Sequence, residues 1–284
     1  MRLGTLDRRA VVIDQGNRYY YDVEVASEGK LSANPVTLLE QWDKFLDWAA
    51  FHDTQPWTEL DVTCLGPPVP TPRQVFALAV NYADHAAEAQ REVPEHPYVF
   101  TKFASCIVGP WSDVVLPSNR CDWEVELVVV IGTGGHKIAA ADAWTRVAGL
   151  TVGQDISERR VQFRKPIPHL SLSKSFPTFG PTGPWLVTPD SVANPDDLAL
   201  SCTVDGEEMQ SSRTSDMVFS VPALVESISA MTPLLPGDLI FTGTPSGTGS
   251  TRDPRRYLEP GDVIVSEIEG IGAIRNTCVE PATN

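Results

Sequence analysis

The segment CDWEVELVVVIGTGG, residues 121–135, restricts the fold more than any other part of the sequence. Side chains of a strand alternate between two faces, so Glu124 and Glu126 share one face with later valines. The segment becomes apolar on both faces, and such a strand is usually covered on both sides, where an unpaired carboxylate is costly. The segment therefore predicts a buried strand whose glutamates need a partner. The alternative is a strand that begins in solvent, with both carboxylates hydrated.

The composition is that of a globular protein with room for a substantial core. Of 284 residues, 42% are hydrophobic and 21% are charged, without an apolar run of 18 residues or a signal-peptide pattern, so we expect a cytoplasmic protein. The formal net charge of -15 repels phosphate backbones and anionic lipid, which argues against nucleic acid and membrane partners. The 5 cysteines and 5 histidines form no zinc motif, so any metal should have oxygen ligands.

A proline-rich stretch divides the sequence. Residues 8–25 are typical of a hairpin and residues 34–50 of an amphipathic helix, whereas LGPPVPTPRQ, residues 65–74, is too rich in proline for a helix or a central strand. We therefore expect a small N-terminal accessory domain over residues 1–66 and a larger domain over residues 67–284.

Strand signals dominate the second part of the chain. Helices are expected only over residues 142–150 and 220–231. Two Pro-Gly-Asp turns, at residues 236–238 and 260–262, each precede an apolar strand. This pattern predicts an α+β, strand-rich fold with strands rolled into a barrel-like body.

Asp155 provides a third carboxylate, because it ends the apolar stretch AGLTVGQD. If its strand lies beside the first, Glu124, Glu126 and Asp155 form an all-oxygen site suited to Mg²⁺ or Mn²⁺, with Ca²⁺ also compatible. The alternative is an ordinary aspartate at the end of a strand.

The loop after Asp155, ISERRVQFRKP, is basic in an acidic chain and suggests an anionic substrate. Arg159 is suited to bidentate contact with a carboxylate, and Gln162 adds a neutral hydrogen bond. The alternative is a solvated loop whose charges pair with Glu158. Lys174 lies among apolar and turn residues, where an ammonium group needs a partner, so we expect it to contact substrate.

His85 and Glu88 are three residues apart and share a face if their segment is helical. In such a pair the carboxylate fixes the tautomer of the imidazole and raises its basicity, as the deprotonation of a water requires. The alternative is an exposed pair on a surface helix.

Two short motif matches are set aside. GTPSGTG at residues 243–249 lacks the ending of a phosphate loop, and SLSK at residues 171–174 has no accompanying serine-enzyme motif.

Over residues 70–280, approximately, the chain resembles the fumarylacetoacetate hydrolase family. The motifs that carry the resemblance occur in the family's order: NYADHAAE, YVFTKFASCIVGP, DWEVELVVVIG, GQDISERRVQ, KSFPTFGPTGPW and PGDLIFTGTPSGTG. The resemblance implies that Glu124, Glu126 and Asp155 hold Mg²⁺ or Mn²⁺, and that the fold is the family's β-roll. It also implies a homodimer.

The resemblance further implies roles for the remaining candidates. His85 and Glu88 match a general-base pair on a segment that closes over ligand. The positions that match substrate contacts are Lys102, Arg159, Gln162, Lys174 and Thr244. The chain departs from the family pattern at Glu158, Arg160 and Pro177, which bears on substrate identity more than on metal binding.

These observations lead to a hypothesis of metal-dependent hydrolysis of a carbon–carbon bond in an acylpyruvate or related small 2-oxo acid. The metal would stabilise the leaving enolate, Lys174 would stabilise negative oxygen, and His85, held by Glu88, would activate the attacking water. The first alternative is an isomerase or decarboxylase of a 2-oxo diacid from aromatic ring cleavage. The second is a catalytically silent metal-dependent binding protein.

Overall fold

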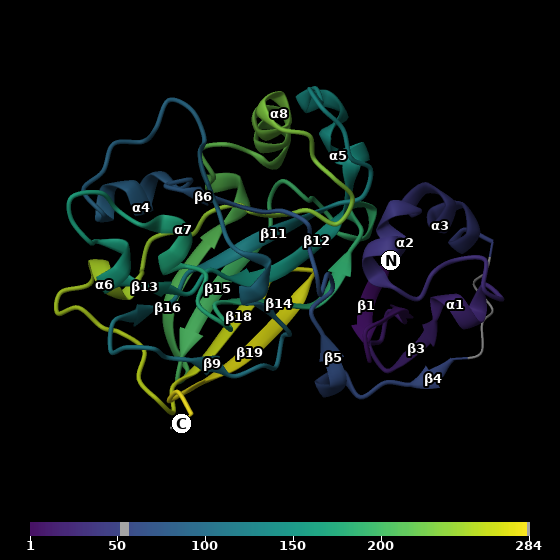
Figure 1. Ribbon diagram of the computed structural model, residues 1–284, viewed down its shortest axis with the longest axis horizontal. Helices are drawn as coiled ribbons and strands as arrows, with labels where there is room; N and C mark the ends of the chain where they lie inside the picture. Colours follow the sequence, from purple (N-terminus) through teal and green to yellow (C-terminus); the bar gives the residue numbers. More distant parts are fainter. Residues whose placement is uncertain (52–56, 283–284) are drawn as a thin grey trace.

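The computed structural model describes residues 1–51 and 57–282, and its centre is one large mixed sheet (Figure 1). Hydrogen-bonded neighbours follow the order β4-β3-β2-β1-β14-β12-β11-β17-β6-β7, with β5 beside β1 and β8 beside β14. The strands of this sheet are β1 (Arg2–Leu6), β2 (Arg9–Ile13), β3 (Tyr19–Asp22), β4 (Thr58–Glu59), β5 (Leu65–Gly66), β6 (Val75–Ala79), β7 (Tyr98–Thr101), β8 (Ile107–Val108), β11 (Val125–Ile131), β12 (Val147–Gln154), β14 (Gly180–Val187) and β17 (Leu239–Phe241).

A second sheet, in the order β16-β15-β18-β19-β9, packs against β11, β12 and β14 of the first, and β10 pairs separately with β13. The strands of these two smaller sheets are β9 (Val114–Val115), β10 (Cys121–Asp122), β13 (Ser157–Glu158), β15 (Ala199–Val204), β16 (Glu207–Arg213), β18 (Val263–Ile268) and β19 (Gly272–Val279). The two Pro-Gly-Asp turns lead into β17 and β18, as expected. Within the described residues each sheet is an open path of strands, so the body is strand-rich without a closed barrel.

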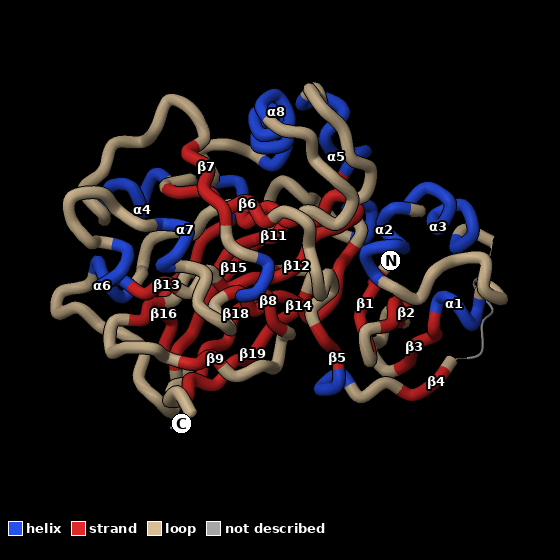
Figure 2. Tube along the Cα trace, viewed as in Figure 1, coloured by secondary structure: helices blue, strands red, loops and turns tan. Residues whose placement is uncertain are grey.

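The helices are short and lie mainly at the periphery of the sheets (Figure 2). Helices α5 and α8 lie near each other at one end of the large sheet, whereas α4, α6 and α7 gather on the side where the candidate site lies. The α-helices are α1 (Val23–Ala26), α2 (Pro35–Glu40), α3 (Trp42–Ala49), α4 (Ala83–Glu88), α5 (Ala143–Arg146), α6 (Arg159–Gln162), α7 (Leu170–Ser173) and α8 (Val221–Met231). The 3₁₀ turns are η1 (Val62–Cys64), η2 (Ala104–Cys106), η3 (Ala140–Asp142), η4 (Pro189–Ser191), η5 (Thr214–Asp216) and η6 (Gly249–Thr251).

Two helix predictions are wrong in their extent. The expected helix over residues 34–50 is two helices, α2 and α3, separated at Gln41, whose φ of -108° and ψ of 25° are not helical. The expected helix over residues 142–150 ends at Arg146, and Val147 begins strand β12. Pairing of β12 along both of its edges decides this second case, because tertiary contacts override a weak local preference for helix.

Strands β11 and β12 form the buried centre of the molecule. They pair antiparallel from Val125 opposite Gln154 to Val130 opposite Gly149, and every residue of both strands is buried. Burial of each Val or Leu side chain contributes roughly 1.5–3 kcal/mol, so this pair supplies a large share of the core. The buried-strand prediction is confirmed and the hydrated alternative is wrong, because Glu124 is 6% exposed and Glu126 is 0% exposed.

The N-terminal strands extend the large sheet, because Arg2 and Leu3 of β1 pair with Val187 and Leu186 of β14. Helices α2 and α3 lie against these strands (Figure 1). The division into an accessory domain over residues 1–66 and a catalytic domain over residues 67–284 stays a prediction. Within the described part of the chain, no helix is both long enough and apolar enough to cross a bilayer.

Candidate active site at three buried carboxylates

The antiparallel register of β11 and β12 brings the three predicted metal-binding carboxylates together. Glu126 lies opposite Gly153, and the backbone N–H of Asp155 donates a hydrogen bond of 2.9 Å to the carbonyl of Glu124. One carboxylate oxygen from each of Glu124, Glu126 and Asp155 lies within 4.8 Å of the other two. All three residues are buried, so bulk water screens their charges only weakly.

The hydrogen bonds of Glu126 leave one of its oxygens without a partner. Its Oε2 accepts a hydrogen bond of 2.8 Å from the N–H of Gly243, whereas its buried Oε1 has no partner among the described residues. Burial, together with the negative charges of Asp155 and Glu124, raises the pKa of Glu126 well above its usual value. Three carboxylates with an unpartnered buried oxygen fit a divalent cation that prefers oxygen ligands.

Two buried lysines compensate part of the negative charge. The Nζ of Lys174 lies 2.6 Å from Glu124 Oε2 and 2.6 Å from Asp155 Oδ2, so it bridges two members of the triad. Burial opposes the ionisation of Glu124, but Lys174 and then Arg159 outweigh it and lower the pKa of this carboxyl group to about 2. The Nζ of Lys102 lies 2.6 Å from Asp155 Oδ1 and donates to the carbonyl oxygen of Phe179. Lys102 does not line the cavity and contacts Asp155 on its buried side. The expected contact of Lys102 with substrate stays a prediction.

Arg159 and Gln162 lie on helix α6 and are buried, so the solvated-loop alternative is wrong for both. The Nη2 of Arg159 lies 2.7 Å from Asp122 and 2.7 Å from Glu124. Its Nη1 donates a hydrogen bond of 2.8 Å to Gln162 Oε1. Glu158 caps the helix by accepting a hydrogen bond from the N–H of Val161. The guanidinium group of Arg159 is therefore held in place by Asp122 and Glu124. Gln162, which accepts a hydrogen bond from it, lines the cavity.

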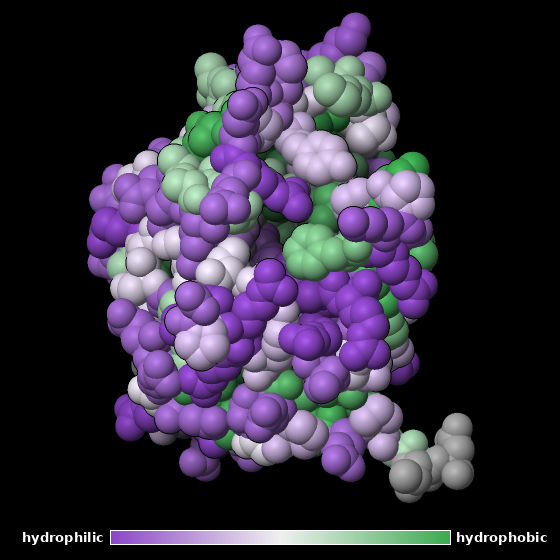
Figure 3. Space-filling view, turned by 90° about the vertical axis from the view of Figure 1, so that its left-hand side faces the viewer, coloured by the Kyte–Doolittle hydropathy of each residue, from purple (hydrophilic) through white to green (hydrophobic). Residues whose placement is uncertain are grey.

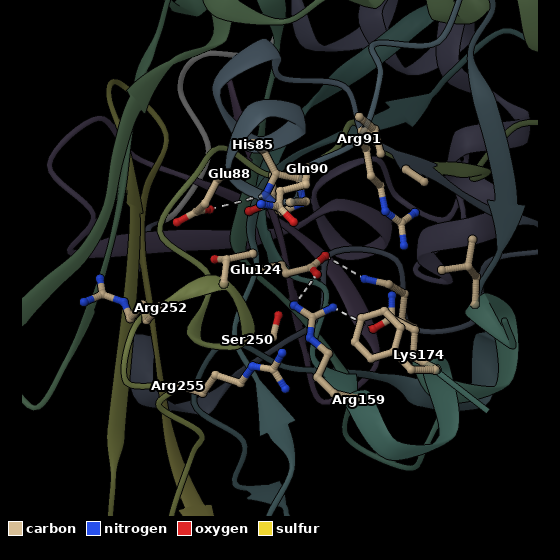
Figure 4. A pocket seen from close by; sticks show the side chains of 18 of the residues that line it. His85, Glu88, Gln90, Arg91, Glu124, Arg159, Lys174, Ser250, Arg252 and Arg255 are labelled. Atoms are coloured by element: carbon tan, nitrogen blue, oxygen red, sulfur yellow. Dashed lines mark hydrogen bonds and ion pairs between the residues drawn. The ribbon is translucent and has the colours of Figure 1, made fainter. Parts of the chain in front are cut away.

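His85 and Glu88 lie on helix α4 and both face the cavity, with the His85 Nδ1 3.8 Å from Glu88 Oε2 (Figure 4). Their side chains are 15% and 26% exposed, so the surface-pair alternative is wrong. Glu88 accepts a hydrogen bond of 3.0 Å from the N–H of Gly247. Burial opposes ionisation of Glu88, but His85 and the Gly247 N–H outweigh it and lower its pKa. Asp84 accepts a hydrogen bond from Ser246 Oγ, so two contacts attach α4 to the turn at residues 243–249.

A cavity of about 730 Å³ opens above Glu124 and collects most of the candidate residues. The hollow lies on the face shown in Figure 3, where hydrophilic side chains predominate. Thr244 lines the cavity and is fixed there, because its Oγ1 donates to the carbonyl of Val125 and accepts from Gln210 Nε2. Seven predicted residues line this space: His85, Glu88, Glu124, Arg159, Gln162, Lys174 and Thr244.

Two residues of this site were not singled out from the sequence. Asp122 is fully buried and accepts hydrogen bonds from the N–H groups of Gly249 at 2.7 Å and Ser250 at 2.9 Å, as well as from Arg159. The alternation that links Glu124 to Glu126 also reaches Asp122, so the signal for it was present. The hydroxyl of Tyr82, at the start of α4, is buried without a partner among the described residues, and no sequence signal indicates this.

Comparison with known proteins gives consistent matches over most of the chain. The family pattern described as fumarylacetoacetate (FAA) hydrolase C-terminal matches residues 74–279. Oxaloacetate tautomerase FAHD2A, mitochondrial, of Bos taurus is 48% identical over 221 residues, covering 77% of this chain and 70% of the relative. The corresponding FAHD2B protein of Homo sapiens is 48% identical over 226 residues, covering 79% of this chain and 71% of the relative.

Solved structures give the same result for the fold. A putative HpcE protein from Mycobacterium smegmatis has a TM-score of 0.95 and 46% identity, covering 99% of this chain and 100% of that one. Maleylpyruvate hydrolase from Sphingobium sp. SYK-6, in complex with manganese (II) ion and pyruvate, has a TM-score of 0.80 and 26% identity, with coverage of 99% and 100%. The chain is therefore an enzyme that belongs to the fumarylacetoacetate hydrolase family.

Proposed function

We propose that the protein is a divalent-metal-dependent tautomerase that interconverts the keto and enol forms of a small 2-oxo dicarboxylate such as oxaloacetate. The observation that carries this proposal is the set of three carboxylates, within 4.8 Å of one another, beside a cavity lined with cationic side chains. The tautomerase names of relatives that are 48% identical favour this reaction over hydrolysis.

Glu124, Glu126 and Asp155 would hold the metal ion, which we propose to be Mg²⁺ or Mn²⁺. When bound, such an ion is a Lewis acid that stabilises negative charge on the 2-oxo oxygen of a substrate. The manganese ion and pyruvate in the related maleylpyruvate hydrolase support this choice of ion and of ligand class.

The side chains of this enzyme would orient the acid and move its proton. Arg159 and Gln162 would bind the carboxylate next to the 2-oxo group, since both are buried at the cavity and held by each other. His85 would remove a proton from C3 of the keto form and return it in the reverse direction, while Glu88 keeps the imidazole oriented. Lys174 would donate a hydrogen bond to the 2-oxo oxygen, which gains a proton in exchange with solvent.

The direct test follows the ultraviolet absorbance of enol-oxaloacetate as it converts to the keto form. The enzyme should accelerate this conversion with Mn²⁺ or Mg²⁺, lose the acceleration with EDTA, and regain it when metal is added back. A metal-loaded protein that leaves the uncatalysed rate unchanged would refute the proposal. Equal acceleration before and after EDTA would refute the role of the metal.

Hydrolysis of an acylpyruvate is the second candidate, and the His85–Glu88 pair favours it. The two side chains lie 3.8 Å apart beside the cavity, where they would act as a general base for water, and the related maleylpyruvate hydrolase has the same overall fold. The two reactions separate in ¹⁸O-labelled water, because only hydrolysis incorporates the label into the released acid. Decarboxylation, the other alternative, would instead release carbon dioxide. Association into a homodimer and a cytoplasmic location stay predictions.

A further inference from the structure

Two arginines at the cavity, Arg91 and Arg255, are exposed and have no anionic partner within residues 1–51 and 57–282. The other arginines of this region are engaged. Arg159 pairs with Asp122 and Glu124, and Arg256 pairs with Glu207 at 2.6 Å. The chain has 37 acidic residues against 22 lysines and arginines, so acidic partners are plentiful elsewhere. Unpaired guanidinium groups at the one site that is expected to bind an anion point to a ligand as their partner.

The position of Arg255 distinguishes it from Arg91 and Arg252. Figure 4 shows the guanidinium of Arg255 directed toward Ser250 and Arg159. Arg252 turns away from the centre of the cavity and donates a hydrogen bond of 3.0 Å to the carbonyl of Met209. Arg91 enters from the opposite side, after helix α4. Arg255 thus adds a second positive charge on the side of the cavity where Arg159 lies, and this favours an anion between them.

The segment that carries Arg255 is attached to the floor of the site through Asp122. The two oxygens of this carboxylate accept the N–H groups of Gly249 and Ser250, and Oδ2 also accepts from Arg159 Nε at 2.8 Å. The N–H of Arg256 donates to the carbonyl of Gly249, which closes the segment on itself. Asp122 therefore fixes the start of the Arg255 segment relative to Arg159, which in turn contacts Glu124 of the triad.

We propose that Arg255 binds the second, distal carboxylate of a 2-oxo dicarboxylate and thereby selects diacids over monoacids. The assignment of the first carboxylate to the triad end of the cavity rests on the proposed function. Arginine presents a planar pair of donors that matches a carboxylate bidentately, so one residue is sufficient for this selection.

A binding experiment tests this role without catalysis. The Mn²⁺-loaded protein is titrated by calorimetry with 2-oxoglutarate and with 2-oxopentanoate, five-carbon acids that differ only in a terminal carboxylate or methyl group. The wild-type enzyme should bind the diacid more tightly. R255Q should bind 2-oxoglutarate about 10- to 100-fold more weakly than wild type, as expected for loss of one charge-assisted bidentate contact. Its affinity for 2-oxopentanoate should not change, so the ratio of the two affinities falls by the same factor.

Two further variants control the charge and the position. R256Q removes the same charge one residue away, from a side chain that pairs with Glu207, and should keep the wild-type ratio. A wild-type enzyme that does not discriminate between the two acids would overturn the proposal. The proposal would also be overturned if R255Q kept the wild-type ratio of the two affinities or bound both acids equally more weakly. Loss of this ratio in R91Q but not in R255Q would overturn it as well.

Kinetics separate this inference from the proposed function. The substrates are enol-oxaloacetate and its 4-ethyl ester, which keeps the 2-oxo acid and removes the distal charge. If R255Q lowers kcat/KM for oxaloacetate and not for the ester, both the reaction and the role of Arg255 are supported. If the wild-type enzyme converts neither compound but the binding ratio still depends on Arg255, the proposed function fails and the inference stands. If the wild-type enzyme converts oxaloacetate but the ratio of binding affinities does not depend on Arg255, the proposed function stands and the inference fails.

Discussion

Replacement of Lys174 by methionine tests whether the triad is built for a divalent cation. The Lys174 ammonium group lies 2.6 Å from Glu124 and 2.6 Å from Asp155, and all three side chains are nearly or fully buried. Methionine fills a similar volume and carries no charge. K174M therefore leaves two buried carboxylates with less compensation, whereas a bound divalent ion would neutralise the same two groups.

The expected magnitude follows from the burial of this contact. Removal of one partner of a buried ion pair costs about 3–5 kcal/mol. In a chain somewhat longer than 250 residues, 1 kcal/mol corresponds to about 2–4 °C or slightly less, so metal-free K174M should melt on the order of 10 °C below wild type. Saturating Mn²⁺ should recover most of this loss. The rise in melting temperature on metal addition should therefore be larger in K174M than in wild type, although the variant loses tautomerase activity.

The assay is thermal unfolding of both proteins in EDTA and in a series of Mn²⁺ concentrations. K30M is the matched control, because Lys30 pairs with Glu28 at 3.5 Å with side chains that are 65% and 82% exposed, and such a pair contributes little. Equal melting temperatures of K174M and wild type in EDTA would show that Lys174 does not compensate the triad. An equal metal-induced rise in both proteins would show that the ion does not act on the carboxylates that Lys174 contacts.

Three other variants test separate parts of the site. E126Q should abolish stabilisation by Mn²⁺ in thermal unfolding while leaving the protein in EDTA at least as stable as wild type, because no described residue donates a hydrogen bond to the buried Oε1 of Glu126. H85A should lower kcat for enol-oxaloacetate by roughly 10²- to 10⁴-fold, with an unchanged calorimetric affinity for 2-oxopentanoate; an unchanged kcat would remove His85 from catalysis. D122N weakens the contacts to Arg159 and to the N–H groups of Gly249 and Ser250. Urea denaturation should show a free energy of unfolding that is lower by about 1–3 kcal/mol. An unchanged value would show that Asp122 does not fix residues 249 and 250.

The sequence predicted the triad because strand geometry is simple. Alternation places Glu124 and Glu126 on one face, and an antiparallel neighbour that leads directly into Asp155 brings the third carboxylate beside them. The same rule reaches Asp122, although its position at the start of the segment gave no indication that it would accept N–H groups from residues 249 and 250.

The partners of the charged residues were not predictable from the sequence. Lys102 follows β7 directly, and its ammonium group contacts Asp155, which lies 53 residues further along the chain. Nor does any local pattern reveal that Arg255 has no acidic partner among the described residues while Arg256, its neighbour, binds Glu207. These outcomes depend on which distant segments meet. The length of the helix at residue 143 likewise depended on strand pairing, which local preference does not report.

The large sheet also bears on how the enzyme unfolds. β14 pairs with β1 on one side and with β12 on the other, and β12 leads directly to Asp155. The N-terminal strands are thus linked to Asp155 through two strand ladders, so we expect unfolding of these strands and of the site to be coupled. Detachment of those strands would bare the edge of β14 at Leu186 and Val187, a template for association with other chains. None of the described residues up to Gly66 lines the cavity, so we expect this part of the chain to contribute by covering the edge of β14.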